Sequence, residues 1–338
     1  MQVNRACINQ SWLNKKMNSR PTGLSSQGFL IRLAGTLIAF CLLVFLLSKQ
    51  GWNEIVVVFS QIPWWRFGLA LFLTLISRLA VSGRWHVLLK SAGVNISFKQ
   101  TIKITFAGLF ASNFLPTTIG GDVIRLTGAI QLKFDSAICA ASLVVDRLVG
   151  MAGMAMTAPL GLQGFFQFIQ TPANSSFYPS GRILSLGLAP LKHWFIWLRQ
   201  KLVKFFSNVT HALSVWIRHP STLFLSLAFS WLHMLCLFIA IAILLDGMND
   251  PMRFWLIAGL WSIVYFITLI PISINGYGLQ ELSMAIIFTR VGGISHQSSL
   301  TLALLVRTLT LFASLPGVVF IPGILSSTSN TPNPSPTK

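Results

Sequence analysis

Several apolar stretches in this chain are about 20 residues long, the length that an α-helix needs to cross the hydrocarbon core of a bilayer. Clear candidate spans lie at roughly 29–48, 66–83, 136–160, 221–245 and 298–325. A weaker stretch at 183–198 contains Pro190, Lys192 and His193, so it either crosses the membrane or lies at the interface. Because backbone polar groups must be satisfied within a bilayer, such stretches fold as helices.

Composition also favours an all-α, polytopic membrane protein. Of the 338 residues, 54% are hydrophobic and 9% are charged, and the mean hydropathy is +0.70, well outside the range of soluble globular proteins. Lys and Arg number 25 against 7 Asp and Glu. In a polytopic protein such an excess mostly marks cytoplasmic loops. No nucleic-acid partner is expected, because no soluble domain is apparent to carry such a site.

The distribution of Lys and Arg predicts an orientation with the N-terminus in the cytoplasm. That orientation places one set of cations on the cytoplasmic side: Arg84, Lys90, Lys99, Lys103, Arg125, Lys133, Arg199, Lys201, Lys204 and Arg218. Asp246 and Asp250 then fall outside. We therefore divide the chain into a basic cytoplasmic N-terminus at 1–28, a transmembrane domain at 29–325 and a disordered Pro- and Ser-rich tail at 326–338.

Two apolar segments, 100–133 and 252–290, are interrupted at their middles by related motifs. Aligning Pro116 with Pro271, 155 residues further on, sets LPTTIGG over IPISING. Proline ends the preceding helix, and glycine lets the backbone turn without steric cost. Freed backbone groups at membrane depth are tolerated only when they are buried in protein or line a wet cavity. Each segment is therefore expected to form an interrupted, re-entrant hairpin beside a cavity.

The fold predicted from these patterns has about six crossings plus two interrupted helical hairpins. If 183–198 crosses the membrane, the hairpins enter from opposite sides, and the halves at about 29–160 and 183–325 form an inverted-topology repeat of the kind seen in transporters. The alternative is that two unrelated loops contain Pro and Gly by chance.

Charged residues inside the candidate spans point to either of two structures. Four such residues are Arg78, Asp146, Arg147 and Arg307. An unpaired charge at the centre of a span costs roughly 2.5–3.5 kcal/mol on the insertion scale. One interpretation is a set of internal ion pairs that fix the packing, for example Asp146 with Arg307 and Glu281 with Arg78. The other is a cationic pocket that binds a phosphate through bidentate arginines.

The first broken motif favours a phosphate site at Arg125 in particular. Arg125 follows Gly120 and Gly121, and it lies three residues after Asp122, so the two charged side chains can share a helix face. The N-terminus of a half-helix carries a partial positive charge that suits an anion. We therefore expect Arg125 to contact the phosphate of a lipid.

Four motifs together resemble the flippase-like transmembrane domain of lysylphosphatidylglycerol synthases and its stand-alone relatives: GRW at 83–85, LPTTIGGDVIR at 115–125, VVDRLVG at 144–150 and PISINGYGLQE at 271–281. The resemblance covers about 29–325 and implies an integral inner-membrane protein. Relatives fused to a soluble aminoacyl-lipid synthase domain move the product lipid across the bilayer, and stand-alone relatives are associated with lipid or polyprenyl-linked sugar pathways. Because only a short tail follows residue 325, aminoacyl transfer is not expected.

By position, the resemblance marks candidate lipid- and phosphate-binding residues: Pro116, Gly120, Gly121, Asp122, Arg125, Arg147, Gly276, Gly278 and Glu281. We add Arg307 because of its place within a span. Two positions depart from the family pattern, since Asn275 stands where Gly is frequent and Asp146 where Glu is common.

The expected function is to bind an anionic phospholipid or a polyprenyl-phosphate-linked lipid in a central cavity and to move it between leaflets, without catalysis. No cofactor or metal is expected, because the chain has no Walker motif and no His or Cys spacing typical of a metal site. A glycosyltransferase or a lipid-modifying enzyme is considered as a protein partner.

Two alternatives remain open. One is a membrane-embedded lipid-linked glycosyl or phosphoryl transferase, for which Asp122 and Glu281 would have to supply the paired carboxylates. The other is a non-catalytic membrane subunit of a glycosyltransferase.

Overall fold

The computed structural model describes residues 62–113, 115, 120–161, 216, 220–270 and 276–322. Several predictions lie outside these residues: the basic N-terminus at 1–28, the spans at 29–48 and 183–198, the tail at 326–338, and Pro116.

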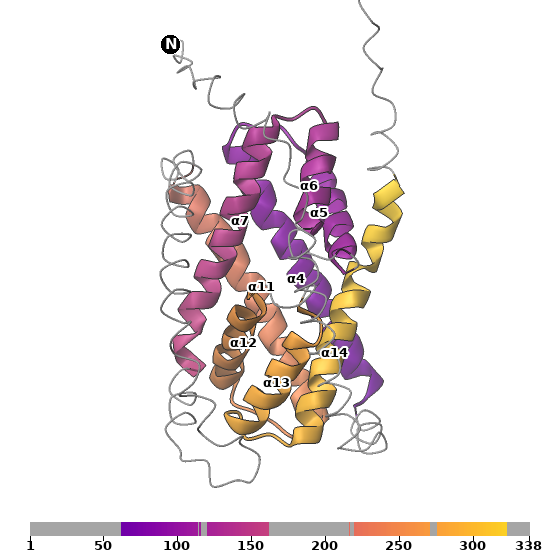
Figure 1. Ribbon diagram of the computed structural model, residues 1–338, viewed down its shortest axis with the longest axis vertical. Coiled ribbons are helices and arrows are strands. Elements are labelled where there is room, and N and C mark those ends of the chain that lie inside the picture. The colour runs from indigo at the N-terminus through magenta and orange to yellow at the C-terminus, as the bar shows by residue number, and fades with distance from the viewer. Residues whose placement is uncertain are drawn as a thin grey trace, which may run out of the picture.

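All the regular elements of the described residues are helices, as predicted (Figure 1). In chain order they are α4 (Trp64–Ser91), α5 (Phe98–Ser112), α6 (Gly120–Gln131), α7 (Ser136–Thr157), α11 (Pro220–Gly247), α12 (Phe254–Thr268), α13 (Leu279–Arg290), α14 (His296–Ser314) and a short 3-10 helix, η2 (Leu315–Phe320). Four stretches of this part of the chain are long and apolar enough to cross a membrane: Trp64–Ser91, Ser136–Gly161, Pro220–Gly247 and His296–Phe320.

Side-chain caps fix several helix starts that hydropathy alone does not define. Ser97 and Gln100 form a capping box at the start of α5. Asp135 accepts hydrogen bonds from two backbone N–H groups of the first turn of α7. Ser295 accepts one from Ser298 at the start of α14. Each cap satisfies N–H groups that have no partner within the helix.

Both interrupted segments are broken where the sequence predicts. Helix α5 ends at Ser112 and α6 begins at Gly120, and α12 ends at Thr268 and α13 begins at Leu279. Gly276 and Gly278 adopt positive φ angles of 71° and 76°. This left-handed conformation is strained for other residues but costs glycine little, which explains why the second break contains these two glycines.

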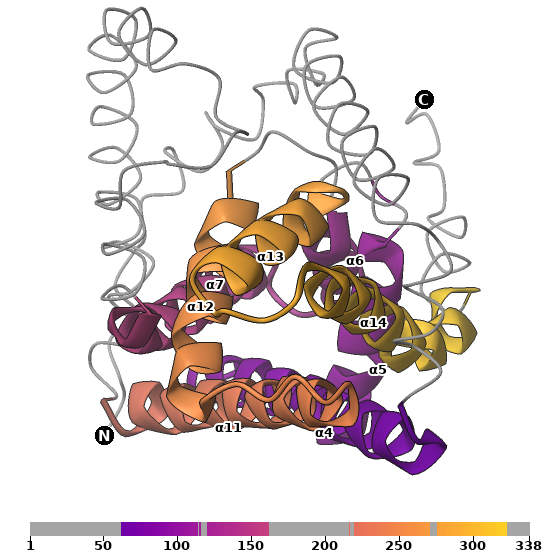
Figure 2. The same ribbon diagram turned by 90° about the horizontal axis from the view of Figure 1, so that it is seen from below.

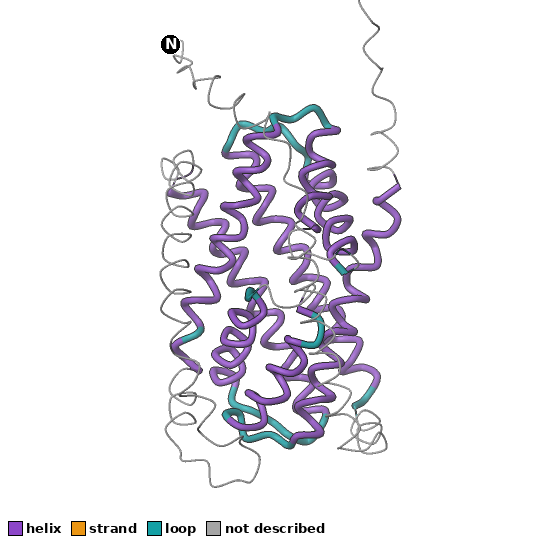
Figure 3. Tube along the Cα trace, in the orientation of Figure 1, coloured by secondary structure: helices purple, strands orange, loops and turns teal. Residues whose placement is uncertain are grey.

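The described helices form two sets of four with closely matched lengths. Helices α4 and α11 have 28 residues each, α5 and α12 have 15, α6 and α13 have 12, and α7 and α14 have 22 and 19. From their first residues, the members of these pairs start 156, 156, 159 and 160 residues apart. Each helix of the second set runs along the long axis in the direction opposite to its counterpart (Figures 1 and 3). The α5–α6 pair therefore reaches the middle from one end, and α12–α13 reaches it from the other.

Helices α4 and α11 lie side by side in one layer, and α12, α13, α14, α5 and α6 lie on one side of it (Figure 2). The α4–α11 contact is the most extensive between any two described helices. At its centre Ser77 Oγ lies 2.5 Å from His233 Nδ1. Each of the two is the fourteenth residue of its helix. Equivalent positions of two related halves can touch only near the axis that relates them, so this contact marks a pseudo-twofold axis.

Candidate functional site

A chain of alternating charges links α4, α6 and α7 in the middle of the molecule. Asp146 accepts a hydrogen bond from Arg84 Nε at 2.6 Å and another from Arg125 Nη1 at 3.1 Å. The same Nη1 lies 3.2 Å from Asp122 Oδ1. Arg147 Nε donates to the second oxygen of Asp122. These five residues, Arg84, Asp146, Arg125, Asp122 and Arg147, are called the ion-pair chain below.

The buried arginines of this chain have further support from neighbouring helices. Arg84 Nη1 donates to Ser230 Oγ of α11 at 3.0 Å. The absence of a side chain at Gly150 makes room for Arg84, because a Cβ there would lie 2.8 Å from Arg84 Nη1. The guanidinium carbon of Arg125 lies 4.3 Å from the ring centroid of Trp85, a cation–π distance. Arg84 and Arg125 are therefore held in place by packing as well as by charge.

A second ion pair joins α13 to α14. Arg307 Nε lies 2.5 Å from Glu281 Oε1, and the Glu281 side chain is buried. The guanidinium carbon of Arg307 also lies 4.3 Å from the ring centroid of Tyr277. Arg307 Nη2 reaches the backbone carbonyl of Gly276 at 3.4 Å. Arg307 thus contacts the turn of the second broken motif directly.

The two halves place these ion pairs at equivalent positions. Asp122 is the third residue of α6, and Glu281 is the third residue of α13. Their partners Arg147 and Arg307 are each the twelfth residue of the following helix. A carboxylate in the first turn also complements the partial positive charge at a helix N-terminus. Each half therefore fixes its broken segment with the same kind of pair.

The predicted pairs Asp146–Arg307 and Glu281–Arg78 are wrong. Asp146 binds arginines of α4 and α6, and Glu281 binds Arg307. Which arginine reaches which carboxylate depends on how the helices are rotated and packed, and the sequence does not report that. The sequence also placed Arg84 among the cytoplasmic loop cations, whereas it is only 7% exposed within α4. Helix α4 continues past residue 83, the predicted end of the span. Arg84 therefore lies within the helix, where its side chain is buried, and not in a loop.

A cavity of about 300 Å³ lies between the described ends of the two broken segments. Three arginines line it: Arg78, Arg147 and Arg307. Its other polar lining residues include Ser112, Asn113, Tyr265, Thr268, Gln280 and Thr310. Of the described residues that line this cavity, none is a carboxylate. The cavity therefore offers cations, hydroxyls and amides, the groups that bind an oxyanion.

One hydrogen bond joins the second motif to the end of α5, just before the first motif, and another joins α4 to α14 beside this cavity. Tyr277, in the second motif, donates through its hydroxyl to the carbonyl of Asn113 at 3.1 Å. Arg78 Nη2 donates to Thr310 Oγ1 at 3.4 Å. Within the described part of the chain, no carboxylate oxygen lies within 4 Å of an Arg78 nitrogen. Arg78 is therefore a cation whose charge no described acidic residue balances.

The residues predicted for the site divide into two groups. Those that line the cavity are Arg147, Gly276 and Arg307. Those that lie elsewhere in the described structure are Gly120, Gly121, Asp122, Arg125, Gly278 and Glu281, of which Asp122, Arg125 and Glu281 form the ion pairs beside it. Sequence reasoning missed Tyr265, Tyr277 and Thr310. Of these three, only Tyr277 could have been identified from the sequence, because it falls between the two glycines of the second motif.

Gly120 and Gly121 serve the packing of α6. A Cβ at Gly121 would lie 2.5 Å from the carbonyl oxygen of Gly108 in α5, and a Cβ at Gly108 would lie 2.6 Å from the carbonyl oxygen of Gly121. A Cβ at Gly120 would lie 2.5 Å from the Cβ of Leu115. Small residues let membrane helices approach closely. These glycines therefore bring α5 and α6 together.

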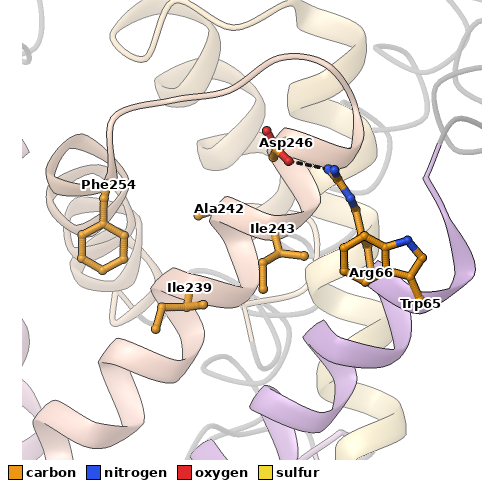
Figure 4. A pocket seen from close by; sticks show the side chains of 7 residues that line it. All are labelled: Trp65, Arg66, Ile239, Ala242, Ile243, Asp246 and Phe254. Carbon is orange, nitrogen blue, oxygen red and sulfur yellow. Dashed lines mark ion pairs between the residues drawn. The ribbon is translucent and has the colours of Figure 1, made fainter.

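Another pocket, of about 380 Å³, lies at the end of the molecule where α11 ends (Figure 4). Apart from Arg66 and Asp246, its described lining is apolar, including Trp65, Ile239 and Phe254. Arg66 Nη1 lies 2.6 Å from Asp246 Oδ2, and the Asp246 side chain is 63% exposed. An arginine and an aspartate, the residue types of the ion-pair chain, thus form a surface pair here, which provides a control.

A family model for the lysylphosphatidylglycerol synthase TM region matches residues 32–317. The match spans all the described helices from α4 to α14 and both broken motifs. A search of curated proteins finds no match to the chain.

Proposed function

The chain belongs to the lysylphosphatidylglycerol synthase transmembrane-region family, and on that premise we propose that this integral membrane protein binds the phosphate of an anionic lipid in its central cavity and moves that lipid between leaflets. The observation that carries the proposal is the convergence of Arg78, Arg147 and Arg307 on one polar cavity between the two broken segments. Cations at membrane depth are costly, and those that face a cavity mark substrate pathways.

The chemistry and size of the cavity favour a phosphate headgroup. Guanidinium groups bind phosphate oxygens through two parallel N–H donors. The cavity volume of about 300 Å³ is at the small end of the range for ligand pockets, roughly 300–1,000 Å³. A headgroup fits this volume, and the acyl or prenyl chains would stay in the surrounding bilayer.

Movement between leaflets is supported by the arrangement of the two broken segments. They reach the cavity from opposite ends of the molecule (Figure 1), as in transporters whose inverted halves alternate access to a central site. We propose that the α4–α5 and α6–α7 loops face the cytoplasm, because the cations at or near that end, Lys90, Lys99, Lys103 and Lys133, outnumber those described at the other end, Arg66, Arg253 and Arg290. By family resemblance the membrane would be the inner membrane.

The carboxylates favour binding over transfer chemistry. A glycosyl or phosphoryl transferase would need a carboxylate free to act as a base or nucleophile. Asp122 and Glu281 are each engaged by an arginine, and neither is among the described residues that line the cavity. Transferase activity is therefore an outcome that the measurement of lipid movement distinguishes from binding and movement.

The test is lipid movement by the purified full chain in phosphatidylcholine vesicles that contain a small fraction of acyl-labelled phosphatidylglycerol. Dithionite added outside quenches only the outer-leaflet label, so complete quenching reports movement. We expect the parent to move the lipid, and Arg78→Gln and the double variant Glu281→Gln/Arg307→Gln to lose most of that activity. The double variant removes a cation together with its counter-ion, which keeps the pair neutral.

The matched control is Arg66→Gln/Asp246→Asn, which removes an arginine–aspartate pair far from the central cavity. It should move lipid like the parent. If the cavity variants are as active as this control, the cavity is not the lipid site. If the parent moves no lipid but labelled product accumulates on addition of a lipid-linked donor, the protein is a transferase.

A further inference from the structure

Two seams join the halves of the fold, and the first lies between α7 and α12. Thr157 Oγ1 of α7 lies 2.6 Å from Ser262 Oγ of α12. One turn after Thr157, the backbone of Gly161 packs directly on that of Gly259, because a Cβ at Gly161 would lie 2.6 Å from the Gly259 carbonyl carbon. These four residues are called the α7–α12 seam below.

The second seam lies between α5 and the end of α14, where η2 begins. A Cβ at Gly317 would lie 2.6 Å from the carbonyl carbon of Phe106, so backbone again packs on backbone. Nearer the middle of the molecule, Asn113 Nδ2 donates to Oγ of Ser314, the N-cap residue of η2, at 2.9 Å. These four residues are called the α5–η2 seam below.

The two seams match position by position. Thr157 and Gly317 are each the twenty-second residue counted from the first residue of α7 and of α14. Ser262 and Phe106 are each the ninth residue of their helices, α12 and α5. The C-terminal ends of α7 and of the α14–η2 stretch point towards opposite ends of the molecule (Figure 1). The seams are therefore counterparts, one towards each face of the membrane.

The helices that form the seams also line the central cavity. Asn113 and Ser314 of the α5–η2 seam are lining residues, and so are Arg147 of α7 and Tyr265 of α12. Separation of α5 from the α14–η2 stretch would open the cavity sideways towards one leaflet. Separation of α7 from α12 would open it towards the other.

The seams should part more easily than the contact at the pseudo-twofold axis. The α4–α11 contact is more extensive than either seam. At the α7–α12 seam, two glycines and two hydroxyl side chains meet, and such groups bury little apolar surface. The α5–η2 seam contains a 3-10 helix, whose hydrogen-bond geometry is poorer than that of an α-helix and which often marks a hinge.

We propose that the α5–η2 and α7–α12 seams are two gates that open in alternation while α4 and α11 stay together. The lipid headgroup then enters the cavity through one gate and leaves through the other. This inference rests on the proposed function and names the helices that must separate for it. Both seams are closed in this structure. A gate between two helices also lets the acyl or prenyl chains remain in the bilayer while the headgroup crosses.

The experiment links each contact with a disulfide, in the full chain with its native cysteines replaced by alanine. The seam variants are Thr157→Cys/Ser262→Cys and Asn113→Cys/Ser314→Cys. The matched control at the axis is Ser77→Cys/His233→Cys. In all three, the replaced side chains now share a hydrogen bond between the two halves. Mass spectrometry confirms each disulfide through the loss of two hydrogens.

Lipid movement is measured by albumin extraction of a short-chain labelled phosphatidylglycerol, which needs no reductant. Each oxidised variant is compared with its own reduced form. We expect either seam disulfide to slow movement by at least about tenfold, because every headgroup must pass both gates. The axis disulfide should leave the rate unchanged. Native mass spectrometry should still find lipid bound to both oxidised seam variants, because the other gate remains free to admit it.

A glycine variant tests the α7–α12 gate without a disulfide. Gly259→Ala places a Cβ 2.6 Å from the Leu160 carbonyl carbon, so α7 and α12 cannot close fully. In protein that elutes as folded from size exclusion, it should slow lipid movement. Gly68→Ala, whose Cβ meets no atom within 4 Å, should not.

The outcomes separate the gates from the proposed function. If the parent moves lipid and neither seam disulfide slows it, the gates are refuted while lipid movement stands. An equal loss with the axis disulfide also refutes them, since any link between the halves would then block movement. Loss of bound lipid on oxidation of the seams would place the block in the cavity instead of a gate. A parent that moves no lipid overturns both proposals.

Discussion

Arg147 and Arg307 line one cavity from equivalent positions of the two halves of the fold. Each is the twelfth residue of its helix, and each binds the carboxylate that stands third in the preceding helix. The halves are not identical around this site. Asp146, beside Arg147, binds two further arginines, whereas the residue before Arg307 is the buried, apolar Val306. Among the described residues, the first half therefore holds a larger network of ion pairs beside the cavity than the second half does.

The Glu281–Arg307 pair should be essential for stability. Glu281→Gln leaves Arg307 without its counter-ion, and the expected loss is about 3–5 kcal/mol of unfolding free energy. Adding Arg307→Gln should recover most of that loss, because the unpaired charge is then gone. Unfolding in detergent measures the unfolding free energy of the single and the double variant. Asp246→Asn at the exposed pair should cost only about 0–1 kcal/mol, and an equal cost at both sites would show that Glu281 is not a buried partner.

Asp146 should be at least as sensitive, because it serves two arginines. Asp146→Asn is expected to destabilise the protein by on the order of 3–5 kcal/mol, and Arg84→Gln in the same chain should recover part of it. The charge swap Asp146→Arg with Arg307→Asp should recover nothing, since these side chains do not pair. Recovery by the swap, measured by thermal unfolding, would contradict the ion-pair chain.

The close contact between α5 and α6 predicts different effects at two glycines. Gly108→Ala places a Cβ 2.6 Å from the Gly121 carbonyl oxygen, so the helices must separate. We expect a loss of about 1–3 kcal/mol, as for overpacked cores. Gly68 in α4 has no atom within 4 Å of such a Cβ, and Gly68→Ala should cost nothing because Ala is the better helix former. Equal stability of the two variants would rule out the tight contact.

The opposed directions of the two halves predict opposite labelling of their loops. Asn95 lies in the α4–α5 loop and Pro251 in the α11–α12 loop, and both are exposed. In a chain with its native cysteines replaced by alanine, Pro251→Cys should react with an impermeant thiol reagent added to intact cells. Asn95→Cys should react only after the inner face is opened. Labelling of both from one side would contradict the proposed topology.

Sequence patterns predicted the helices and the breaks because their causes are local. Hydropathy located four described spans to within a few residues, apart from the longer end of α4 at Ser91, and the glycines of the second motif marked a real left-handed turn. Side-chain partners were not predictable in the same way. From the sequence, Arg84 looks like a cation in a loop after a membrane span. Only the packing of α4 against α7 and α11 shows that its side chain reaches Asp146 and Ser230.

The repeat also carried less information in the sequence than in the structure. The aligned motifs are 155 residues apart, but the spacing of the paired helices grows from 156 to 160 along the chain. A single fixed offset therefore does not align Arg147 with Arg307. The two arginines align when residues are counted from the start of each helix. The helix starts in turn depend on caps such as Asp135 and Ser295.

The most direct test of the account is native mass spectrometry of lipid that stays bound to the protein purified in a mild detergent. The parent and Arg66→Gln/Asp246→Asn should each retain a phosphate-bearing lipid. Arg78→Gln and Glu281→Gln/Arg307→Gln, folded as judged by size-exclusion chromatography, should retain little of it. If all four proteins carry the same lipid in the same amount, the arginine-lined cavity is not where the protein binds a headgroup.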